Sequence, residues 1–306
     1  MKVLIATQKP FAAVAVNGIK EILEAAGHTV VLFEKYAEQA DLVNAVADAD
    51  GLIIRSDKVT AEVIAAAPRL KIVIRAGAGF DNVDLAAATA RGIVVMNTPG
   101  QNSNAVAELA VAMMIYMART QFTPATGREI SGRTLGIQAF GNVGRLVGAK
   151  AKALGMKVKA IDPFLSAEQI ISGGAEPAVS LEELYSTSDF VSIHIPATPQ
   201  TIGSIGYDLI TSMPKGATLV NTARKEVIDE EGLRKALEDR PDIMYVTDVA
   251  PDNYAALREQ FGLRVFATPK KMGAQTSEAN INAGLAAARQ MCDWFATGNA
   301  RFQVNR

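Results

Sequence analysis

The sequence predicts an α/β protein with two parallel-sheet domains. Its length of 306 residues favours two domains, because a typical domain has about 150 residues. Short runs rich in β-branched residues alternate with stretches rich in Ala, Leu and Glu, which is typical of parallel sheets covered by helices. The alternation starts again after a polar stretch with one Pro and two Gly at 120–132, which we expect to be a linker.

The first half of the chain holds the strands expected for one such sheet. They are the apolar, mostly β-branched runs at 3–6, 29–33, 52–54, 72–75 and 93–96. Helical patterns lie between them. The pattern at 17–26 ends at Gly27, in the position where a left-handed residue closes a helix.

The second half repeats the arrangement after a long buried helix expected at 106–118. Further strands are expected at 135–138, 158–161, 190–194, 218–221, 244–247 and 265–267. Ser166 and Gln169 have the spacing of a capping box, which predicts the start of a short helix. The chain closes with an Ala-rich helix expected at 276–297.

Composition and charge exclude several classes of protein. The 31 basic and 32 acidic residues give a net charge of −1, without the basic excess of nucleic-acid or membrane-surface proteins. The longest uncharged apolar run, 109–118, is too short for a membrane span, which needs about 20 residues. The only cysteine, Cys292, cannot form a disulfide within the chain. We therefore expect a cytoplasmic protein with no nucleic-acid or membrane partner and no metal site.

A glycine-containing turn predicts a dinucleotide site. The strand at 135–138 runs into Ala139-Phe-Gly141-Asn142-Val143-Gly144 and a helix, and the next strand ends at Asp162. In such βαβ units the turn receives a pyrophosphate and the acidic residue receives a ribose. No arginine follows Asp162 to accept a 2′-phosphate, which favours NAD over NADP. Ala139 replaces the first glycine of the usual motif, so a tight turn without a ligand remains the alternative.

Six segments, in order, resemble the D-isomer-specific 2-hydroxyacid dehydrogenases over nearly the whole chain. They are IRAGAGFDNVDLAAATARGIVVMNTPGQN, GRTLGIQAFGNVGRLVGAKAKALGMKVKAIDPF, VSIHIPATPQT, MPKGATLVNTAR, TDVAPD and ATPKKMGAQTSEA. RSDKVTAEVI and RAGAGFDNVD are most similar to the branch that acts on 3-phosphoglycerate. The resemblance implies an NAD-dependent oxidation of D-3-phosphoglycerate to 3-phosphohydroxypyruvate, the first step of serine biosynthesis, and its reverse.

The resemblance also implies an architecture. We expect two Rossmann-like or flavodoxin-like parallel-sheet domains with a cleft between them. Residues 1–99 plus 275–306 would bind the substrate, and residues 100–274 would bind NAD. The family implies a homodimer, although the stretch at 120–132 is shorter than its counterpart in the family's dimer contact. Longer members add regulatory domains after the last helix, so serine feedback through such a domain is not expected here.

The expected catalytic residues depart from the family pattern at one position. Arg224 matches the family's arginine, which holds the substrate carboxylate and polarises the C2 oxygen. Lys270 stands where the family has its acid/base histidine, and the histidine's glutamate partner is missing, with Asp252 nearby. Either Lys270 and Asp252 replace that pair, or Lys270 only binds an anionic group of the substrate. His194 is the next candidate for the acid/base.

The remaining site residues also follow from the resemblance. Cofactor contacts are expected from Gly141, Asn142, Val143, Gly144, Asp162, His194, Ile195, Thr222 and Ala223, with Asp248 receiving the nicotinamide carboxamide. Contacts to a small, anionic, phosphorylated 2-hydroxy acid are expected from Arg55, Ser56, Arg75, Gly77, Ala78 and Asn102.

Two other functions stay open on the sequence alone. The first is a reductase for glyoxylate, hydroxypyruvate or another 2-keto acid. The second is a non-catalytic NAD(H)-binding interaction protein, which the missing histidine and Ala139 favour. The arginines Arg55, Arg75 and Arg224 favour an enzyme, because a pure cofactor sensor would not need them.

Overall fold

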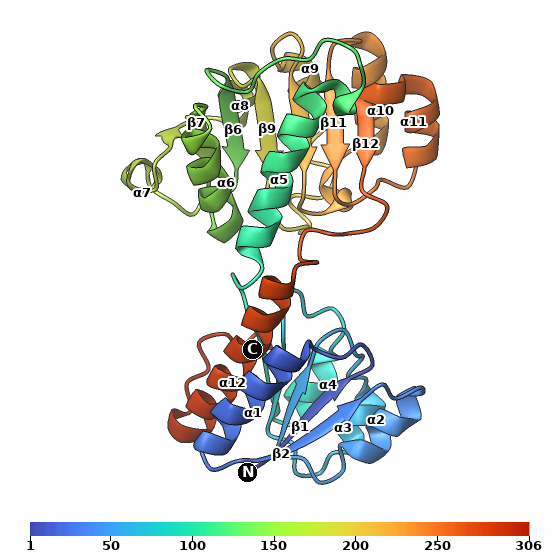
Figure 1. Ribbon diagram of the computed structural model, residues 1–306, viewed down its shortest axis with the longest axis vertical. Coiled ribbons are helices and arrows are strands. Elements are labelled where there is room, and N and C mark those ends of the chain that lie inside the picture. The colour runs from blue at the N-terminus through green and yellow to red at the C-terminus, as the bar shows by residue number, and fades with distance from the viewer. Residues whose placement is uncertain (306) are drawn as a thin grey trace. The chain divides into compact units, whose positions relative to one another are not determined.

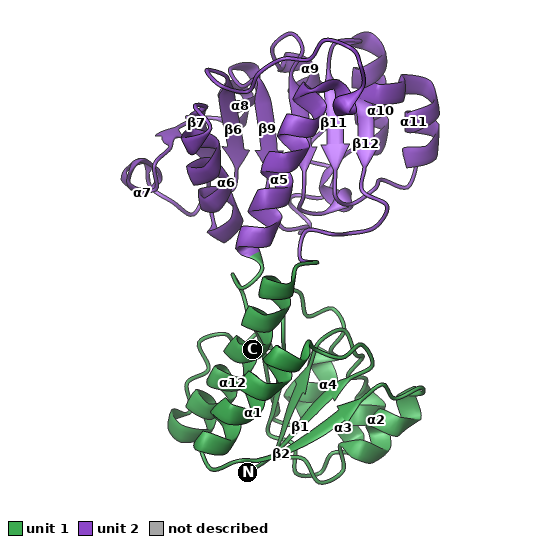
Figure 2. Ribbon diagram, in the orientation of Figure 1, with its two compact units in different colours: residues 1–102, 275–306 green, residues 103–274 purple. Residues whose placement is uncertain are grey.

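A computed structural model describes residues 1–305. These residues divide into two compact units (Figure 2). The first unit comprises residues 1–102 and 275–306, and the second comprises residues 103–274. None of the helices within residues 1–305 has the length and apolar character needed to cross a membrane.

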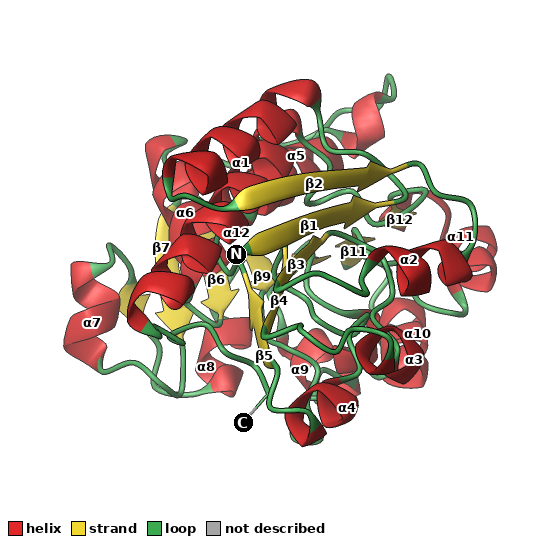
Figure 3. Cartoon of the chain, turned by 90° about the horizontal axis from the view of Figure 1, so that it is seen from below, coloured by secondary structure: helices red, strands yellow, loops and turns green. Residues whose placement is uncertain are grey.

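The first unit is built on an all-parallel sheet of order β2-β1-β3-β4-β5 (β1 and β2 are labelled in Figure 1, all five strands in Figure 3). Its strands are β1 (Lys2–Thr7), β2 (Thr29–Glu34), β3 (Gly51–Ile54), β4 (Ile72–Arg75) and β5 (Val94–Asn97). All of them coincide with expected strands to within about one residue. The interior strands are buried on both faces, which explains why they read as continuous apolar runs.

Helices cover both faces of this sheet (Figure 3). One face carries α1 (Ala13–Ala25) and α12 (Ser277–Thr297), and the other carries α2 (Gln39–Ala45), α3 (Ala61–Ala65) and α4 (Leu85–Ala90). The contact between α1 and α12 is close because Gly284 has no side chain; an added Cβ there would lie 2.8 Å from Ile19. This packing brings the end of the chain back to the first unit.

The second unit has an all-parallel sheet of order β12-β11-β10-β9-β6-β7-β8. Its strands are β6 (Thr134–Gln138), β7 (Lys157–Ile161), β8 (Glu176–Pro177), β9 (Phe190–Ile193), β10 (Thr218–Asn221), β11 (Met244–Thr247) and β12 (Val265–Ala267). The two-residue β8 was not expected, because it is too short to carry a strand pattern. The strand order reverses between β6 and β9, which is where such sheets bind ligands.

Two apolar layers enclose this second sheet. Val220 and Val246 point to one face and Leu219 and Tyr245 to the other, as the alternation of strand side chains requires. The first face is covered by α5 (Ser103–Ala118), α6 (Asn142–Ala153) and α7 (Ala167–Ser172), and the second by α8 (Leu181–Ser186), α9 (Tyr207–Ser212), α10 (Glu230–Asp239) and α11 (Tyr254–Phe261). The expected capping box of Ser166 and Gln169 opens α7.

The linker expected at 120–132 is wrong, because this stretch lies inside the second unit. The long helix α5 precedes it and already belongs to the second unit, where Met113, Met114 and Met117 are buried in the core. The boundary therefore falls before α5. The turn after α5 is unusual because Thr120, Gln121 and Phe122 all have positive φ, between 51° and 58°.

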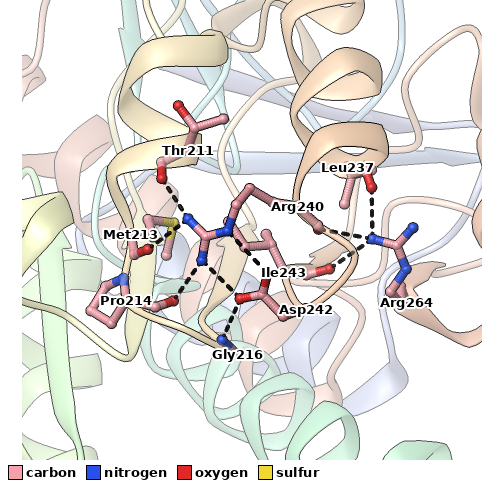
Figure 4. A network of polar contacts seen from close by, with 9 residues as sticks. All are labelled: Thr211, Met213, Pro214, Gly216, Leu237, Arg240, Asp242, Ile243 and Arg264. Carbon is pink, nitrogen blue, oxygen red and sulfur yellow. Dashed lines mark hydrogen bonds and ion pairs between the residues drawn. The ribbon is translucent and has the colours of Figure 1, made fainter.

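A network of hydrogen bonds and one ion pair lies at the amino ends of β10 and β11 (Figure 4). Arg240 forms an ion pair of 2.8 Å with Asp242 and holds the pKa of that carboxyl well below its usual range. Arg240 also donates to the carbonyl oxygens of Thr211, Met213 and Pro214. Arg264 donates to those of Leu237, Arg240 and Ile243. These arginines donate hydrogen bonds to carbonyl oxygens near helix ends, which have no partner within their helix. Both lie at the amino edge of the sheet, opposite the edge that carries the predicted site residues.

Candidate functional site

In both units the expected site residues follow the carboxyl ends of parallel strands, where open α/β sheets bind ligands. In the second unit they follow β6, β7, β9, β10, β11 and β12. In the first unit they follow β3, β4 and β5.

The turn between β6 and α6 suits a pyrophosphate. Helix α6 starts after Gly141, and no side chain within residues 1–305 caps its first turn, so its N–H groups can bind an anion. A Cβ added to Gly141 would meet no atom within 4 Å, so the turn is open there. A Cβ on Gly144 would lie 2.3 Å from the Ala139 carbonyl oxygen, which explains why this position needs glycine.

Ala139 takes the backbone conformation of the glycine that it replaces. Its φ is +73°, in the left-handed region, where a Cβ costs about 1 kcal/mol or more. Its N–H still donates to the Ile161 carbonyl oxygen at 2.9 Å, so the turn is kept despite the strain.

Replacing Ala139 with glycine should therefore stabilise the second unit. Relief of about 1 kcal/mol corresponds to a rise in Tm of about 2–4 °C, and NAD affinity should rise slightly or stay unchanged. Scanning calorimetry and NAD titration measure both. Ala149→Gly is the matched control, because this exposed residue lies inside helix α6, where glycine should lower the stability of the protein by about 1 kcal/mol. A Tm for Ala139→Gly below that of the wild type would contradict the inference that the Ala139 backbone is strained.

Asp162 connects the end of β7 with this turn. Its carboxylate accepts the N–H of Phe140 at 2.8 Å and that of Phe164 at 2.9 Å. The side chain is half-buried, and a carboxylate can accept more than two hydrogen bonds. Asp162 therefore keeps acceptor capacity for ribose hydroxyls.

Four further residues lie at the edge of this sheet. His194 follows β9, and its Nε2 lies 2.9 Å from Ser192 Oγ, while burial lowers its pKa to about 4. Its imidazole is therefore neutral near pH 7. Thr222 follows β10, and its buried Oγ1 has no hydrogen-bond partner among the described residues. Such a hydroxyl is expected to gain a partner when a ligand binds. The apolar Ile195 and Ala223 lie beside them and are buried.

Asn221 shapes the loop that carries Arg224. Its Oδ1 accepts the Ala223 N–H and its Nδ2 donates to the Arg224 carbonyl oxygen, both at 2.9 Å. The Arg224 side chain is exposed, with Nη1 donating to the Ala223 carbonyl oxygen at 2.9 Å. No carboxylate within residues 1–305 forms an ion pair with Arg224. Its guanidinium is thus open to an anionic ligand.

The expected pairing of Asp252 with Lys270 is wrong. Asp252 Oδ1 lies 2.5 Å from Lys225 Nζ, and the side chain is exposed. This contact raises the pKa of Lys225. In this structure Asp252 therefore pairs with Lys225 and not with Lys270.

Asp248 is buried and bonded to the loop after β12. It is 1% exposed, and its carboxylate accepts hydrogen bonds from that loop. Its Oδ1 accepts from Thr268 Oγ1 at 2.8 Å and from the Met272 N–H at 2.7 Å. Its Oδ2 accepts from the Gly273 N–H at 2.7 Å. Asp248 therefore holds the loop in place, and its contact with the nicotinamide carboxamide stays a prediction.

The loop that Asp248 holds carries Lys270. Thr268 Oγ1 also lies 2.9 Å from the Lys270 carbonyl oxygen, so the loop is fixed on both sides of Pro269. The Lys270 side chain is exposed, and in the part of the chain that the structure describes no carboxylate pairs with it. A fixed backbone with an accessible amine suits either proton transfer or anion binding.

The first unit places two arginines side by side at its carboxyl edge. Arg55 follows β3, and its Nη2 donates to Asn280 Oδ1 of α12 at 2.5 Å. Arg75 ends β4, and its Nε donates to the Arg55 carbonyl oxygen at 2.9 Å. The Arg75 guanidinium lies over Gly77, where a Cβ would be 1.7 Å from Nη1 and φ is +149°. Glycine is therefore needed at position 77, because a side chain there would collide with the Arg75 guanidinium.

The loop after β4 is tied to the end of β5. Asn97 Nδ2 donates to the Ala78 carbonyl oxygen at 2.6 Å, and the Thr98 N–H donates to that of Gly77 at 2.9 Å. Ser56 is exposed beside Arg55, and Asn102 is half-buried at the end of the segment. The expected substrate residues thus occupy one edge of the first sheet.

Several residues that shape the site were not predicted. Asn280 contacts Arg55 from a helix 225 residues away in sequence. Asn221 and Thr268 act through hydrogen bonds to backbone groups of their loops. Asparagine and threonine after a strand are the available signal, because both bond readily to nearby backbone.

A comparison with known proteins identifies the family. The catalytic-domain pattern of D-isomer specific 2-hydroxyacid dehydrogenases matches residues 10–305. The chain belongs to this family.

Curated relatives of this dehydrogenase are similar along most of its chain. The D-3-phosphoglycerate dehydrogenase of Rattus norvegicus is 37% identical over 289 residues, which are 90% of this chain and 54% of that protein. That of Methanocaldococcus jannaschii is 37% identical over 286 residues, or 89% of this chain and 54% of that protein. The chain spans about half the length of these curated relatives.

Solved structures of the family match the chain end to end. The NAD+-bound 3-phosphoglycerate dehydrogenase of Entamoeba histolytica has a TM-score of 0.87 and 49% identity, and covers 100% of this chain and 99% of its own. D-lactate dehydrogenase from Escherichia coli has a TM-score of 0.80 and 24% identity over 99% of this chain and 100% of its own, and shares the fold.

Proposed function

We propose that this dehydrogenase oxidises D-3-phosphoglycerate to 3-phosphohydroxypyruvate with NAD, reversibly, as the first step of serine biosynthesis. The observation that carries the proposal is the 49% identity, over the whole chain, with an NAD+-bound 3-phosphoglycerate dehydrogenase. Arginines at strand ends in both units support it, because the substrate carries a carboxylate and a phosphate. The first unit would bind substrate and the second would bind NAD.

The second unit would hold the cofactor at the edge described above. Gly141 to Gly144 would bind the pyrophosphate through backbone N–H groups, and Asp162 the adenosine ribose. His194, Ile195, Thr222 and Ala223 would line the nicotinamide side. When bound, NAD accepts the hydride from C2 of the substrate. Asp162 also repels a 2′-phosphate, which favours NAD over NADP.

Arg224 and Lys270 would perform the remaining chemistry. The Arg224 fork would hold the substrate carboxylate and stabilise charge on the C2 oxygen. In oxidation Lys270 would take the proton of the C2 hydroxyl, and in reduction it would return it. A protonated amine, the usual form of lysine near neutral pH, suits reduction directly.

The arginines of the first unit should recognise the phosphate. Replacing Arg55 or Arg75 with alanine should lower kcat/KM for 3-phosphohydroxypyruvate by about 10–150-fold, since a charge-assisted contact contributes about 1.5–3 kcal/mol. Hydroxypyruvate, which lacks the phosphate, should lose much less. Parallel NADH-oxidation assays with both substrates measure the difference, and Arg289→Ala, which removes an exposed arginine of α12 in the same unit, is the control. Equal losses for the two substrates would exclude phosphate recognition.

The proposed function as a whole is tested by NADH oxidation with purified protein. We expect 3-phosphohydroxypyruvate to be reduced with a kcat/KM well above those for hydroxypyruvate and glyoxylate, and NADH to be used well above NADPH. Preference for an unphosphorylated keto acid would assign another reductase activity. NADH binding without turnover of any of the three would assign a binding protein.

The assembly and location of the protein stay predictions from the family. We propose a homodimer in the cytoplasm.

A further inference from the structure

Asp57 is a buried carboxylate at the carboxyl edge of the first sheet. It is 3% exposed, and no cation among the described residues forms an ion pair with it. Its carboxylate instead accepts hydrogen bonds from three donors. Oδ1 accepts from the Gln8 N–H at 2.6 Å and the Tyr36 hydroxyl at 2.7 Å, and Oδ2 from the Arg55 N–H at 3.3 Å.

These donors come from three separate strand ends. Gln8 follows β1, Tyr36 follows β2 and Arg55 follows β3. Tyr36 is itself buried and stacked on Phe33, with ring centroids 5.0 Å apart. Burial and the hydrogen bond to Asp57 raise the pKa of Tyr36, so it remains a protonated donor. The carboxylate therefore joins the ends of three strands in one hydrogen-bond network.

The arginines are linked to this carboxylate through one backbone segment. Asp57 accepts the N–H of Arg55, and the carbonyl oxygen of the same Arg55 accepts Nε of Arg75. The backbone of Arg55 is thus held on one side by Asp57 and in turn holds the Arg75 guanidinium on the other.

We propose that Asp57 is a positioning residue that sets Arg55 and Arg75 for a phosphorylated substrate. The inference rests on the proposed function, which gives the two arginines the phosphate. Asp57 does not touch the substrate and acts only through the Arg55 backbone. Its removal should therefore affect phosphate recognition more than reduction itself.

Two substitutions separate this role from simple stability. Asp57→Asn keeps the shape but has one acceptor oxygen. That oxygen is expected to stay with Gln8 and Tyr36, which leaves the amide NH2 facing the Arg55 N–H, donor against donor. Tyr36→Phe instead removes one donor and leaves the link to Arg55 intact. The first variant loosens Arg55 and the second does not.

The test combines kinetics with hydrogen exchange on the full chain. Asp57→Asn should raise KM for 3-phosphohydroxypyruvate about tenfold, as expected for a weakened charge-assisted contact, with kcat and the KM for hydroxypyruvate changed less than about twofold. The amide of Arg55 should exchange faster in Asp57→Asn and at the wild-type rate in Tyr36→Phe. Tyr36→Phe should keep the wild-type ratio of the two KM values.

Three results would overturn the proposal. The first is an Arg55 amide that exchanges at the wild-type rate in Asp57→Asn. The second is an equal rise in KM for 3-phosphohydroxypyruvate and hydroxypyruvate in that variant. The third is the same change in the ratio of these two KM values in Tyr36→Phe. If the wild-type protein does not prefer the phosphorylated substrate, the proposed function fails instead. Exchange at Arg55 then decides alone whether Asp57 positions this backbone.

Discussion

Replacing Lys270 with alanine is expected to lower kcat for 3-phosphohydroxypyruvate reduction by about 10²–10⁴, with a smaller change in KM. The reason is that Lys270 is exposed on a loop whose backbone is fixed by Asp248 and Thr268, and no carboxylate within residues 1–305 pairs with its amine. Steady-state kinetics in both directions measure the effect. A variant that keeps kcat and only raises KM would make Lys270 a binding residue.

The pH dependence distinguishes Lys270 from the other candidate base. As the base in oxidation, Lys270 must offer a neutral amine, so Lys270→Ala should lower the oxidation rate across the whole range from pH 6 to 8. His194, with its pKa lowered to about 4 by burial, is neutral from pH 6 to 8 and would change the rate only in acid. Lys270→Arg should not restore activity, because a guanidinium does not release its proton at working pH. A profile that turns near pH 4 and persists in Lys270→Ala would favour His194.

The fold could be predicted because its information is local. Parallel strands buried on both faces read as short apolar runs, and Gly27 and Ser166 mark helix ends through their own backbone preferences. The linker at 120–132 was wrong because composition does not show which sheet a helix packs on. Helix α5 is apolar nearly all round, so its pattern gives no direction, and only its contacts place it in the second unit.

The site could be predicted only in part for a similar reason. Strand ends are visible in the sequence, so Arg55, Arg75 and Arg224 could be assigned to the edges where the structure has them. The hydrogen-bond and ion-pair partners of the acidic residues could not be predicted, because they depend on the conformations of the loops that carry them. Asp248 turns inward to backbone N–H groups and Asp252 outward to Lys225. Hydrogen bonds between segments far apart in sequence decide both, and no local spacing encodes them.

Removing Arg224 should damage the reaction with every 2-keto acid. We expect Arg224→Ala to lower kcat/KM by about 10²–10³, the loss usual for one donor to a developing oxyanion, for 3-phosphohydroxypyruvate and hydroxypyruvate alike. Both substrates carry the carboxylate and the C2 oxygen, and only one carries the phosphate. Equal losses therefore distinguish Arg224 from Arg55 and Arg75 in the same pair of assays.

The structure also provides a control for Arg224 on its own loop. The Arg224 side chain is exposed, and within residues 1–305 it donates only to the Ala223 carbonyl oxygen, so its loss should leave Tm nearly unchanged. Lys225→Ala removes the adjacent cation and an exposed ion pair with Asp252, which adds little to stability because water screens it. Lys225→Ala should keep most of the activity. Arg224→Lys, which keeps the charge without the guanidinium fork, should recover little of the activity that is lost in Arg224→Ala. Similar losses in Lys225→Ala would mean that loop shape, and not the Arg224 guanidinium, limits the rate.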